Sequence, residues 1–267
     1  MQSIAKSAIW FSTLLCAGGL EAATILYDQN FENPTGFVND GGDVNIFRTV
    51  NQLYGNQPPG FTFAQNFTVE TLLITGTQAF GAGYSDPSGT GGHYALGMLS
   101  TTQNDLLGLS FNVGANSFFN FRLDISSIDL SVFGGPFVPV AGTIPAFQFT
   151  LYDNPSGATG LGGGTILDQQ QASGTASPRD VFDWTPVLLA LDASGTTNGN
   201  VTLQIDLLNG GYAAMDNFRI VASDIPGDVG GVPEPATWTL LSGGVAAFLG
   251  VRRWRKNLNA DGRGALA

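Results

Sequence analysis

Hydrophobic and polar residues alternate with a period of two along three segments of the chain, 118–126, 146–153 and 200–208. Such alternation is typical of strands in antiparallel sheets that bury one face and expose the other. We therefore predict a strand in each segment. The positions predicted to face inward are Phe119, Phe121, Leu123, Ile125, Phe147, Phe149, Leu151, Val201, Leu203, Ile205 and Leu207.

Further segments have the composition of strands, and turn sequences such as NDGG, QPPG and LNGG separate them. No helical pattern is found before Ala236, and no repeat of fixed period indicates a propeller or β-helix. The chain thus predicts an all-β fold, a single jelly-roll-like antiparallel β-sandwich over residues 23–222. The additional predicted strands are Thr24–Asp28, Phe61–Val69, His93–Leu99, Leu107–Val113, Ile128–Phe133, Pro186–Leu191 and Tyr212–Val221.

Charge is distributed unevenly over the 267 residues, whose net charge is −11. Residues 23–232 hold four cations and eighteen carboxylates, a net charge of −14, and contain no lysine. A body this acidic repels nucleic acid and anionic lipid, so neither is expected as its partner. The single cysteine, Cys16, lies outside the body, which excludes a disulfide or a cysteine-based metal site there.

The N-terminal residues 1–22 have the pattern of a secretory signal peptide. Lys6 supplies the positive charge, Ala8 to Leu20 is apolar, and Ala22 is a small residue at the expected cut. Signal peptidase is therefore an expected partner. Leu15 before Cys16 argues against a lipoprotein, because a small residue would be wanted at that position.

The C-terminal segment 236–251 contains sixteen residues without a charge. As a helix it would span about 24 Å, close to the ~30 Å of a hydrocarbon core, so we predict a transmembrane helix. Cations stay on the cytoplasmic side, which places the body outside and residues 257–267 in the cytoplasm. Residues 223–232 before it are predicted to be a flexible Pro/Gly linker. The cations after the helix are Arg252, Arg253, Arg255 and Lys256.

Pro233, Glu234 and Pro235, followed by this apolar segment and these cations, resemble the PEP-CTERM sorting signal of Gram-negative bacteria. The resemblance covers residues 233–256, a region also called the ice-binding protein C-terminal domain. It implies that an exosortase processes the tail near Pro-Glu-Pro. It also implies transient anchoring in the inner membrane, followed by a cell-surface or extracellular location among exopolysaccharide and biofilm.

A second resemblance concerns the two ends of the body. YDQNFEN and AAMDNFRIV are similar to the first and last strands of jelly-roll carbohydrate-binding and adhesion modules, which implies a structural calcium. Alternation places Asp216 on the same face as Phe218 and Ile220, so it is predicted to point inward. A buried carboxylate needs a partner, and Ca²⁺ prefers oxygen ligands. We expect Asp216, with Asp28 or Glu32, to bind Ca²⁺; a turn cap or an arginine pair is the alternative.

Catalytic residues are not expected. His93 is the only histidine, and no G-x-S-x-G motif is present. Two carboxylate pairs, Asp180 with Asp183 and Asp124 with Asp129, could in principle hydrolyse glycosides, but nothing singles them out.

Aromatic residues beside Gly-rich loops could stack on sugar rings, and the candidates are Trp184, Tyr84 and Tyr94, with Tyr54 beside a further such loop. The alternative is that Trp184 fills the core. The sequence therefore favours an exported, non-enzymatic surface or matrix protein that an exosortase processes. A calcium-dependent carbohydrate-binding or adhesion module is the alternative, and a secreted polysaccharide hydrolase is less favoured. Literal ice binding is disfavoured because the threonines form no regular array.

Overall fold

The computed structural model describes residues 23–38, 49–66, 69–75, 84–99, 105–128 and 142–230. The predicted signal peptide, sorting signal, transmembrane helix and cytoplasmic tail lie outside these residues. So does all but the first residue of the predicted strand Ile128–Phe133. Within the described ranges, no helix has both the length and the apolar character needed to cross a membrane.

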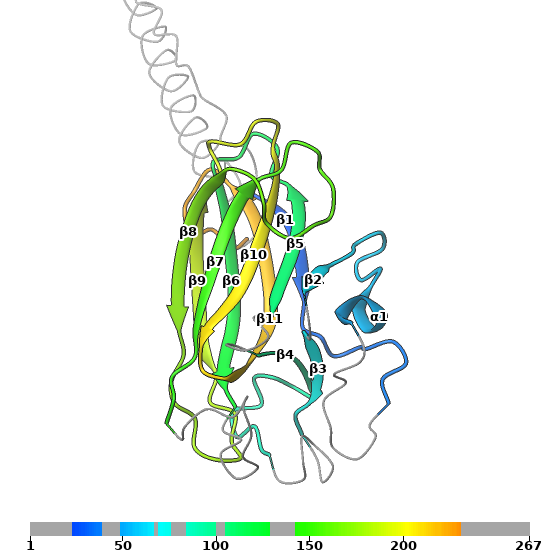
Figure 1. Cartoon of the computed structure of the whole chain (residues 1–267), viewed down its shortest axis with the longest axis vertical. Helices are drawn as coiled ribbons and strands as arrows, with labels where there is room; N and C mark the ends of the chain where they lie inside the picture. Colours follow the sequence, from blue (N-terminus) through cyan, green and yellow to red (C-terminus); the bar gives the residue numbers. More distant parts are fainter. Residues whose placement is uncertain are drawn as a thin grey trace, which may run out of the picture.

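Two antiparallel sheets pack face to face (Figure 1). One sheet has the order β3-β4-β11-β6-β9, with β1 also paired to β11, and the other has the order β2-β5-β10-β7-β8. The all-β sandwich predicted from the sequence is confirmed. Its elements are β1 (Thr24–Gln29), α1 (Val50–Tyr54), β2 (Ala64–Asn66), β3 (Glu70–Leu73), β4 (Tyr94–Leu99), β5 (Leu106–Asn112), β6 (Phe118–Ser127), β7 (Ala146–Asp153), β8 (Ile166–Ser173), β9 (Thr185–Asp192), β10 (Asn200–Asn209) and β11 (Tyr212–Ser223).

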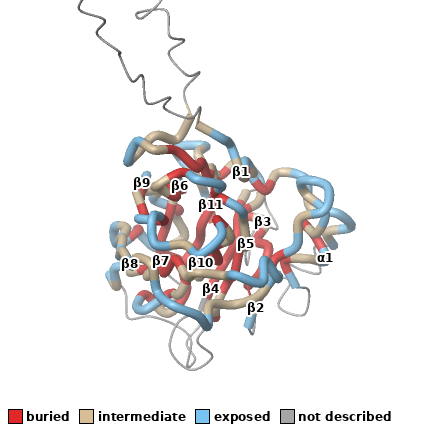
Figure 2. The backbone as a smooth tube through the Cα atoms, turned by 90° about the horizontal axis from the view of Figure 1, so that it is seen from above, coloured by how far each residue is buried: buried red, intermediate tan, exposed pale blue. Residues whose placement is uncertain are grey.

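The main core lies between the two sheets, where the buried residues gather in Figure 2. Every position predicted to face inward from β6, β7 and β10 is buried in this core. Burial of these large side chains is the dominant favourable term in folding. The period-two alternation therefore predicted β6, β7 and β10 correctly, together with the face that each strand buries.

Two elements differ from the prediction. β8 was not predicted, because ILDQQQAS is an edge strand with exposed positions along its length and no clear alternation. The short helix α1 was also missed, since five residues carry too little helical periodicity to be recognised. In addition, the described part of the predicted strand Phe61–Val69 contains the three-residue strand β2, and β3 begins at Glu70.

β11 is the central strand of its sheet, and its two edges are used differently. One edge pairs with β6, whereas the other pairs first with β4 and then with β1. The register shifts between Asp216 and Arg219, where Asn217 has a φ of 54°. A bulge of this kind bends the strand and re-aims its side chains. It separates the part of β11 that pairs with β4 from the part that pairs with β1.

A second, smaller hydrophobic cluster is distinct from the main core. It contains Tyr212 and Ala214 of β11 together with side chains from β3, β4 and the loops around them. Because Ala213 and Met215 belong to the main core, Ala214 must face the opposite side of the sheet. The remaining members are Leu72, Ile74, Tyr84, Ala95, Ile128 and Phe182, with Trp184 packed against them.

Phe121 is the best position for testing the main core. Its ring makes edge contacts with Phe149 of the facing sheet at 5.8 Å and with Phe218 of β11 at 5.0 Å. We expect Phe121→Ala to lower the free energy of unfolding by about 3–5 kcal/mol, measured by denaturant titration, because it leaves a cavity between the sheets. Arg122→Ala, at the adjacent exposed position, should stay within about 0.5 kcal/mol of wild type. Equal effects of the two substitutions would contradict this packing.

Candidate functional site

Three segments meet at the bulge of β11: residues 30–33 after β1, the loop 84–93 before β4, and Asp216 with Asn217 themselves. They meet there because β4 and β1 share one edge of β11 and leave the bulge between them. The segments bring the carboxylates of Glu32, Asp86 and Asp216 into one region, beside Asp124 of the neighbouring strand β6.

Glu32 connects residues 30–33 to the end of the loop 84–93 through hydrogen bonds. Its Oε1 accepts hydrogen bonds from the backbone N–H groups of His93 at 2.8 Å and Tyr94 at 3.1 Å. Its Oε2 lies 3.0 Å from Nδ1 of His93. Gly92 passes directly over this carboxylate, with a φ of 58°, and a Cβ there would lie 2.3 Å from Oε1. The close approach therefore requires a glycine.

Asn217 joins the bulge to the loop and to β6. Its Nδ2 donates to the backbone oxygen of Thr90 and to Oδ2 of Asp124, each at 2.9 Å. Within the loop, Asp86 accepts from the N–H of Gly91 at 2.8 Å and from the Ser88 hydroxyl at 2.7 Å. These bonds give the loop a defined shape against β11.

Asp216 is the most perturbed carboxylate of the site. Its side chain is 1% exposed, and Oδ1 accepts a hydrogen bond from the N–H of Asn217 at 2.5 Å. Oδ2 is buried and has no hydrogen-bond partner within the described part of the chain. Burial raises the pKa of Asp216 to about 9, and the charges of Glu32, Asp124 and Asp86 add to the shift.

The structure corrects the predicted direction of Asp216. It pairs in register with Asp124 and lies between Met215 and the bulge, so it faces away from the main core, as Ala214 does. The bulge at Asn217 breaks the alternation, so Asp216 does not share a face with Phe218. Its burial was predicted, but the covering side chains come from the loops rather than from the facing sheet.

Asp28, the other predicted partner, is paired elsewhere. Nη1 of Arg219 donates to its Oδ2, and the side chain of Asp28 is 59% exposed. The geometry thus favours Glu32 over Asp28 as the companion of Asp216. It does not support the alternative in which Asp216 itself pairs with an arginine, because in the described residues the ion pair of Arg219 is with Asp28.

The donor set suits calcium better than a softer metal. In the described ranges, no three side chains of His, Cys, Asp or Glu come close enough together to form a metal-binding group. A Ca²⁺ ion held by Asp216 and Glu32 would therefore need its remaining ligands from backbone oxygens and water. The unpartnered, buried Oδ2 of Asp216 fits this role, since a cation would supply the missing partner.

The predicted aromatic platforms occupy different environments. Tyr84 is buried and packs on Phe182 with ring centroids 5.5 Å apart, so its ring offers no free face to a sugar. Trp184 stacks on the same Phe182, with ring centroids 5.6 Å apart, and is only partly buried. Tyr94 makes an edge contact with Phe37 at 4.9 Å. The structure does not bring the three side chains into a single platform.

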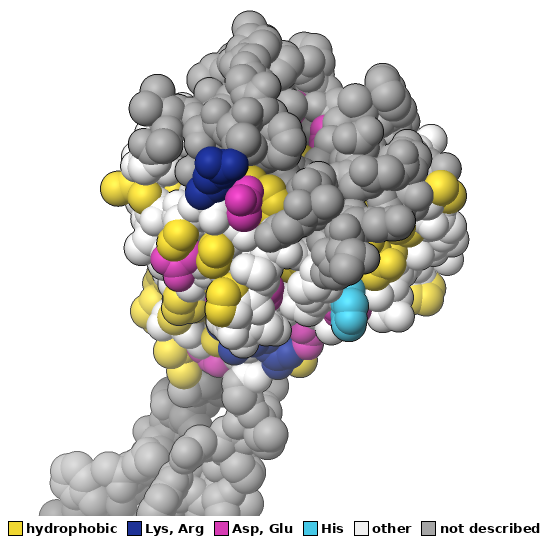
Figure 3. Space-filling view, turned by 90° about the horizontal axis from the view of Figure 1, so that it is seen from below, with side chains coloured by type: hydrophobic (Ala, Val, Ile, Leu, Met, Phe, Trp, Pro, Cys, Tyr) yellow, Lys and Arg dark blue, Asp and Glu magenta, His cyan; other side chains and the backbone are white. Residues whose placement is uncertain are grey.

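The residues considered as catalytic candidates form hydrogen bonds or ion pairs with neighbouring side chains. The side chain of His93 is 72% exposed, and its described partner is Glu32. The histidine is visible at the surface in Figure 3 (cyan). Asp180 lies 3.5 Å from Nε of Arg179, while Asp183 accepts a hydrogen bond from Thr175. Asp124 accepts from Asn217, and Asp129 lies outside the described residues.

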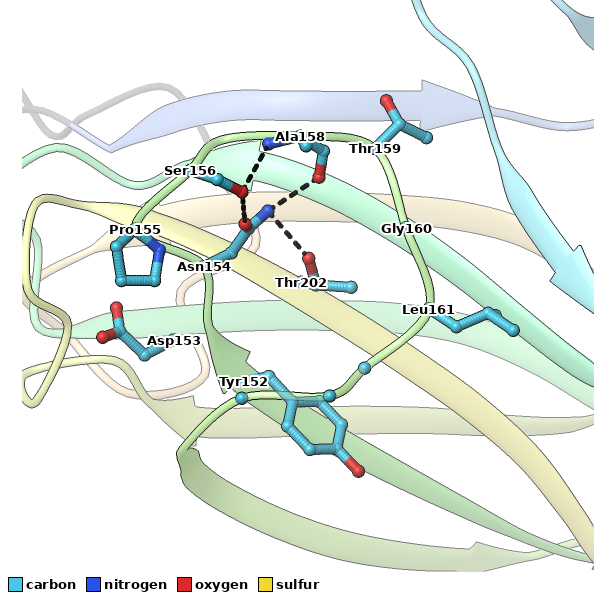
Figure 4. A pocket seen from close by; sticks show the side chains of 13 residues that line it. Tyr152, Asp153, Asn154, Pro155, Ser156, Ala158, Thr159, Gly160, Leu161 and Thr202 are labelled. Atoms are coloured by element: carbon cyan, nitrogen blue, oxygen red, sulfur yellow. Dashed lines mark hydrogen bonds between the residues drawn. The ribbon is translucent and has the colours of Figure 1, made fainter.

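A hollow of about 530 Å³ lies between the loop 154–164 and the outer face of the second sheet. Tyr152 and Thr202, which pair across β7 and β10, line it beneath the loop (Figure 4). Asn154 donates to Thr202 at 3.0 Å and to the backbone oxygen of Ala158 at 2.9 Å. This hollow could not be predicted from the sequence, because its Gly-rich stretch GATGLGGG indicates only a turn.

The solved structures that match this chain have low similarity to it. A xylan-binding domain from CBM 22 is 13% identical, with 74% of this chain and 95% of that chain covered and a TM-score of 0.38. The K3 cleaved adhesin domain of Lys-gingipain from Porphyromonas gingivalis is 9% identical, with 75% and 99% covered and a TM-score of 0.36. At these values no ligand transfers from either protein to this chain.

The C-terminal end gives a definite match. No curated protein is significantly similar to this chain. The family model of the PEP-CTERM protein-sorting motif matches residues 231–256, which contain Pro233, Glu234, Pro235 and the four cations. The sorting signal read from the sequence is thereby confirmed: this chain carries a PEP-CTERM protein-sorting motif behind an all-β body.

Proposed function

We propose that this chain is an exported, non-enzymatic surface or extracellular-matrix protein whose tail is removed by an exosortase near Pro-Glu-Pro. The motif at residues 231–256 carries the proposal, because such a motif implies export and membrane anchoring before release at the surface of a Gram-negative bacterium. An acidic, lysine-free body that lacks cysteine fits an extracellular setting rich in neutral polymers and divalent cations. Association with exopolysaccharide or biofilm is part of this proposal.

Dependence on the exosortase tests this function directly. In the native host, we expect the body in the extracellular or cell-surface fraction. In a strain without exosortase, the uncut chain should stay in the membrane fraction, because its apolar tail has not been removed. Immunoblots of the two strains with an antibody against the body would show the difference. An identical distribution in both strains would contradict the proposal.

A calcium-dependent carbohydrate-binding or adhesion module is the second candidate. The buried, unpartnered oxygen of Asp216 favours it, because a bound cation would complete that site and fix the loop 84–93. The hollow beneath the loop 154–164 is lined by hydroxyl and amide groups and by the Tyr152 ring, a combination that suits a neutral sugar. We place the sugar site there in preference to Tyr84, whose ring is buried.

Sedimentation with purified exopolysaccharide tests the second candidate. The wild-type protein should co-sediment with the polysaccharide in calcium and should do so less after chelation. Tyr152→Ala should weaken binding by roughly tenfold if the ring contributes about 1.5 kcal/mol to stacking. Tyr94→Ala serves as the matched aromatic control outside the hollow. Equal binding by the two variants would remove the hollow as the sugar site, and no binding by wild type would remove the second candidate.

A further inference from the structure

The segment after β11 is fastened to the body, although the sequence predicts a flexible linker over residues 223–232. Asn120 of β6 donates to the backbone oxygen of Ile225 at 3.1 Å and accepts from the N–H of Gly227 at 2.7 Å. Ser117 donates to the carboxylate of Asp224 through both its N–H and its hydroxyl. The prediction of a free linker therefore does not hold for residues 224–230.

Arg219 makes the last attachment. Its Nε donates to the backbone oxygen of Val229 at 2.7 Å, its Nη2 donates to that of Gly230 at 2.8 Å, and its Nη1 donates to Asp28 of β1. The side chain is 18% exposed, so these charge-assisted bonds are partly shielded from water. One guanidinium group thus joins the first strand, the last strand and the tail.

This attachment controls how far the sorting motif can move from the body. Only residues 231 and 232 separate Gly230 from Pro233, a reach of about 10 Å in extended chain. Without the two bonds from Arg219, the motif would be joined to Asp228, which Ser223 still holds, by a chain that reaches about 17 Å. An enzyme embedded in the membrane must enclose the chain on both sides of the cut, and a body held within about 10 Å obstructs it.

We propose that Arg219 is a positioning residue for C-terminal processing: by holding Val229 and Gly230, it keeps the body close to Pro-Glu-Pro and limits the rate of the cut. The inference rests on the exosortase processing proposed above. Cleavage of a held segment proceeds through its open form, so the rate follows the population of that form. Loss of two hydrogen bonds from a charged group should raise this population at least about tenfold.

Pulse-chase labelling of the full chain in the native host tests this inference with two different changes. Arg219→Met removes the attachment. Six Gly/Ser residues inserted between Gly230 and Gly231, directly before the matched motif, lengthen the free chain while every contact of Arg219 stays in place. Their effect therefore cannot come from a weakened body. Each change should speed the loss of the tail by at least about tenfold, and the combination should be no faster than either alone.

Arg122→Met is the matched control, because Arg122 pairs with Arg219 in register but makes no bond to residues 224–230 in the described structure. It should be processed at the wild-type rate. The inference is overturned if Arg219→Met behaves like this control, or if the substitution and the insertion multiply each other's effects. If wild type and all variants keep their tails, the proposed processing itself is wrong and the inference falls with it. If wild type is processed normally and the variants are processed at the same rate, only the role of Arg219 is overturned.

Discussion

Without calcium, the protein should lose stability steadily as the pH rises from 3.8 to about 9. The lower value is the ordinary pKa of an aspartate, and the higher one is the pKa of Asp216 in the folded protein. Because the folded pKa is the higher one, the folded state binds the proton more tightly than the unfolded state does. The stability that Asp216 contributes is complete below the ordinary value and is lost as the pH rises toward the folded value. The slope is about 1.4 kcal/mol per pH unit, so on the order of 4 kcal/mol separates pH 5 from pH 8.

Calcium should remove most of this slope. A cation beside Asp216 stabilises the ionised form, and binding therefore becomes stronger as the pH rises. We expect a clear rise in melting temperature on adding calcium at pH 8 and a smaller rise at pH 5. Isothermal titration should show one site in wild-type protein. No heat, together with an unchanged melting temperature under chelation, would contradict the calcium site.

Asp216→Asn gives the sharpest form of this test. The neutral amide avoids the cost of a buried charge, so the variant should be more stable than metal-free wild type at pH 8 and should not respond to calcium. Asp206→Asn is the control, because burial also raises the pKa of Asp206 but this residue lies on the other sheet. It should keep the calcium response. A calcium response in the Asp216 variant would contradict the assignment.

Replacing Pro233, Glu234 and Pro235 together by alanine should abolish processing. Proline disfavours a helix at its own position and at the residue before it. Alanine favours helix, so the apolar segment could extend toward the body, and the charge of Glu234 would be lost. We expect the uncut form to accumulate at least about tenfold in the membrane fraction, measured by immunoblot, since a tenfold change needs only about 1.4 kcal/mol.

Asn257→Ala, directly beyond the matched motif, is the control for this substitution and should be processed normally. A triple variant that is cut at the wild-type rate would show that Pro-Glu-Pro is not the recognised segment. Its body should fold as wild type does, because the substitutions follow the last attached residue, Gly230.

The sequence predicted the strands of the fold better than it predicted the site. Alternation identified the inward positions of β6, β7 and β10, because those strands bury one complete face. It failed for β8, whose polar residues lie at a sheet edge, and for Asp216, where one bulge reverses the face. A bulge has no reliable signature in a single sequence, because it depends on how the neighbouring strands pair.

Polar contacts between residues far apart in the chain could not be predicted from the sequence either. Nothing in the sequence indicates that Arg219 bonds to backbone oxygens ten and eleven residues later, because any residue can supply such an acceptor. The same holds for Glu32, which accepts from N–H groups of His93 and Tyr94, far away in the chain. By contrast, the sorting motif was recognised directly, since its three parts follow one another within residues 231–256.

The central claim is that the chain is exported and trimmed at both ends. Mass spectrometry of the mature protein purified from the native host tests it most directly. We predict a polypeptide that begins near Ala23 and ends close to Pro233, without the apolar segment and the cations behind it. A cytosolic protein with the mass of all 267 residues would contradict the account.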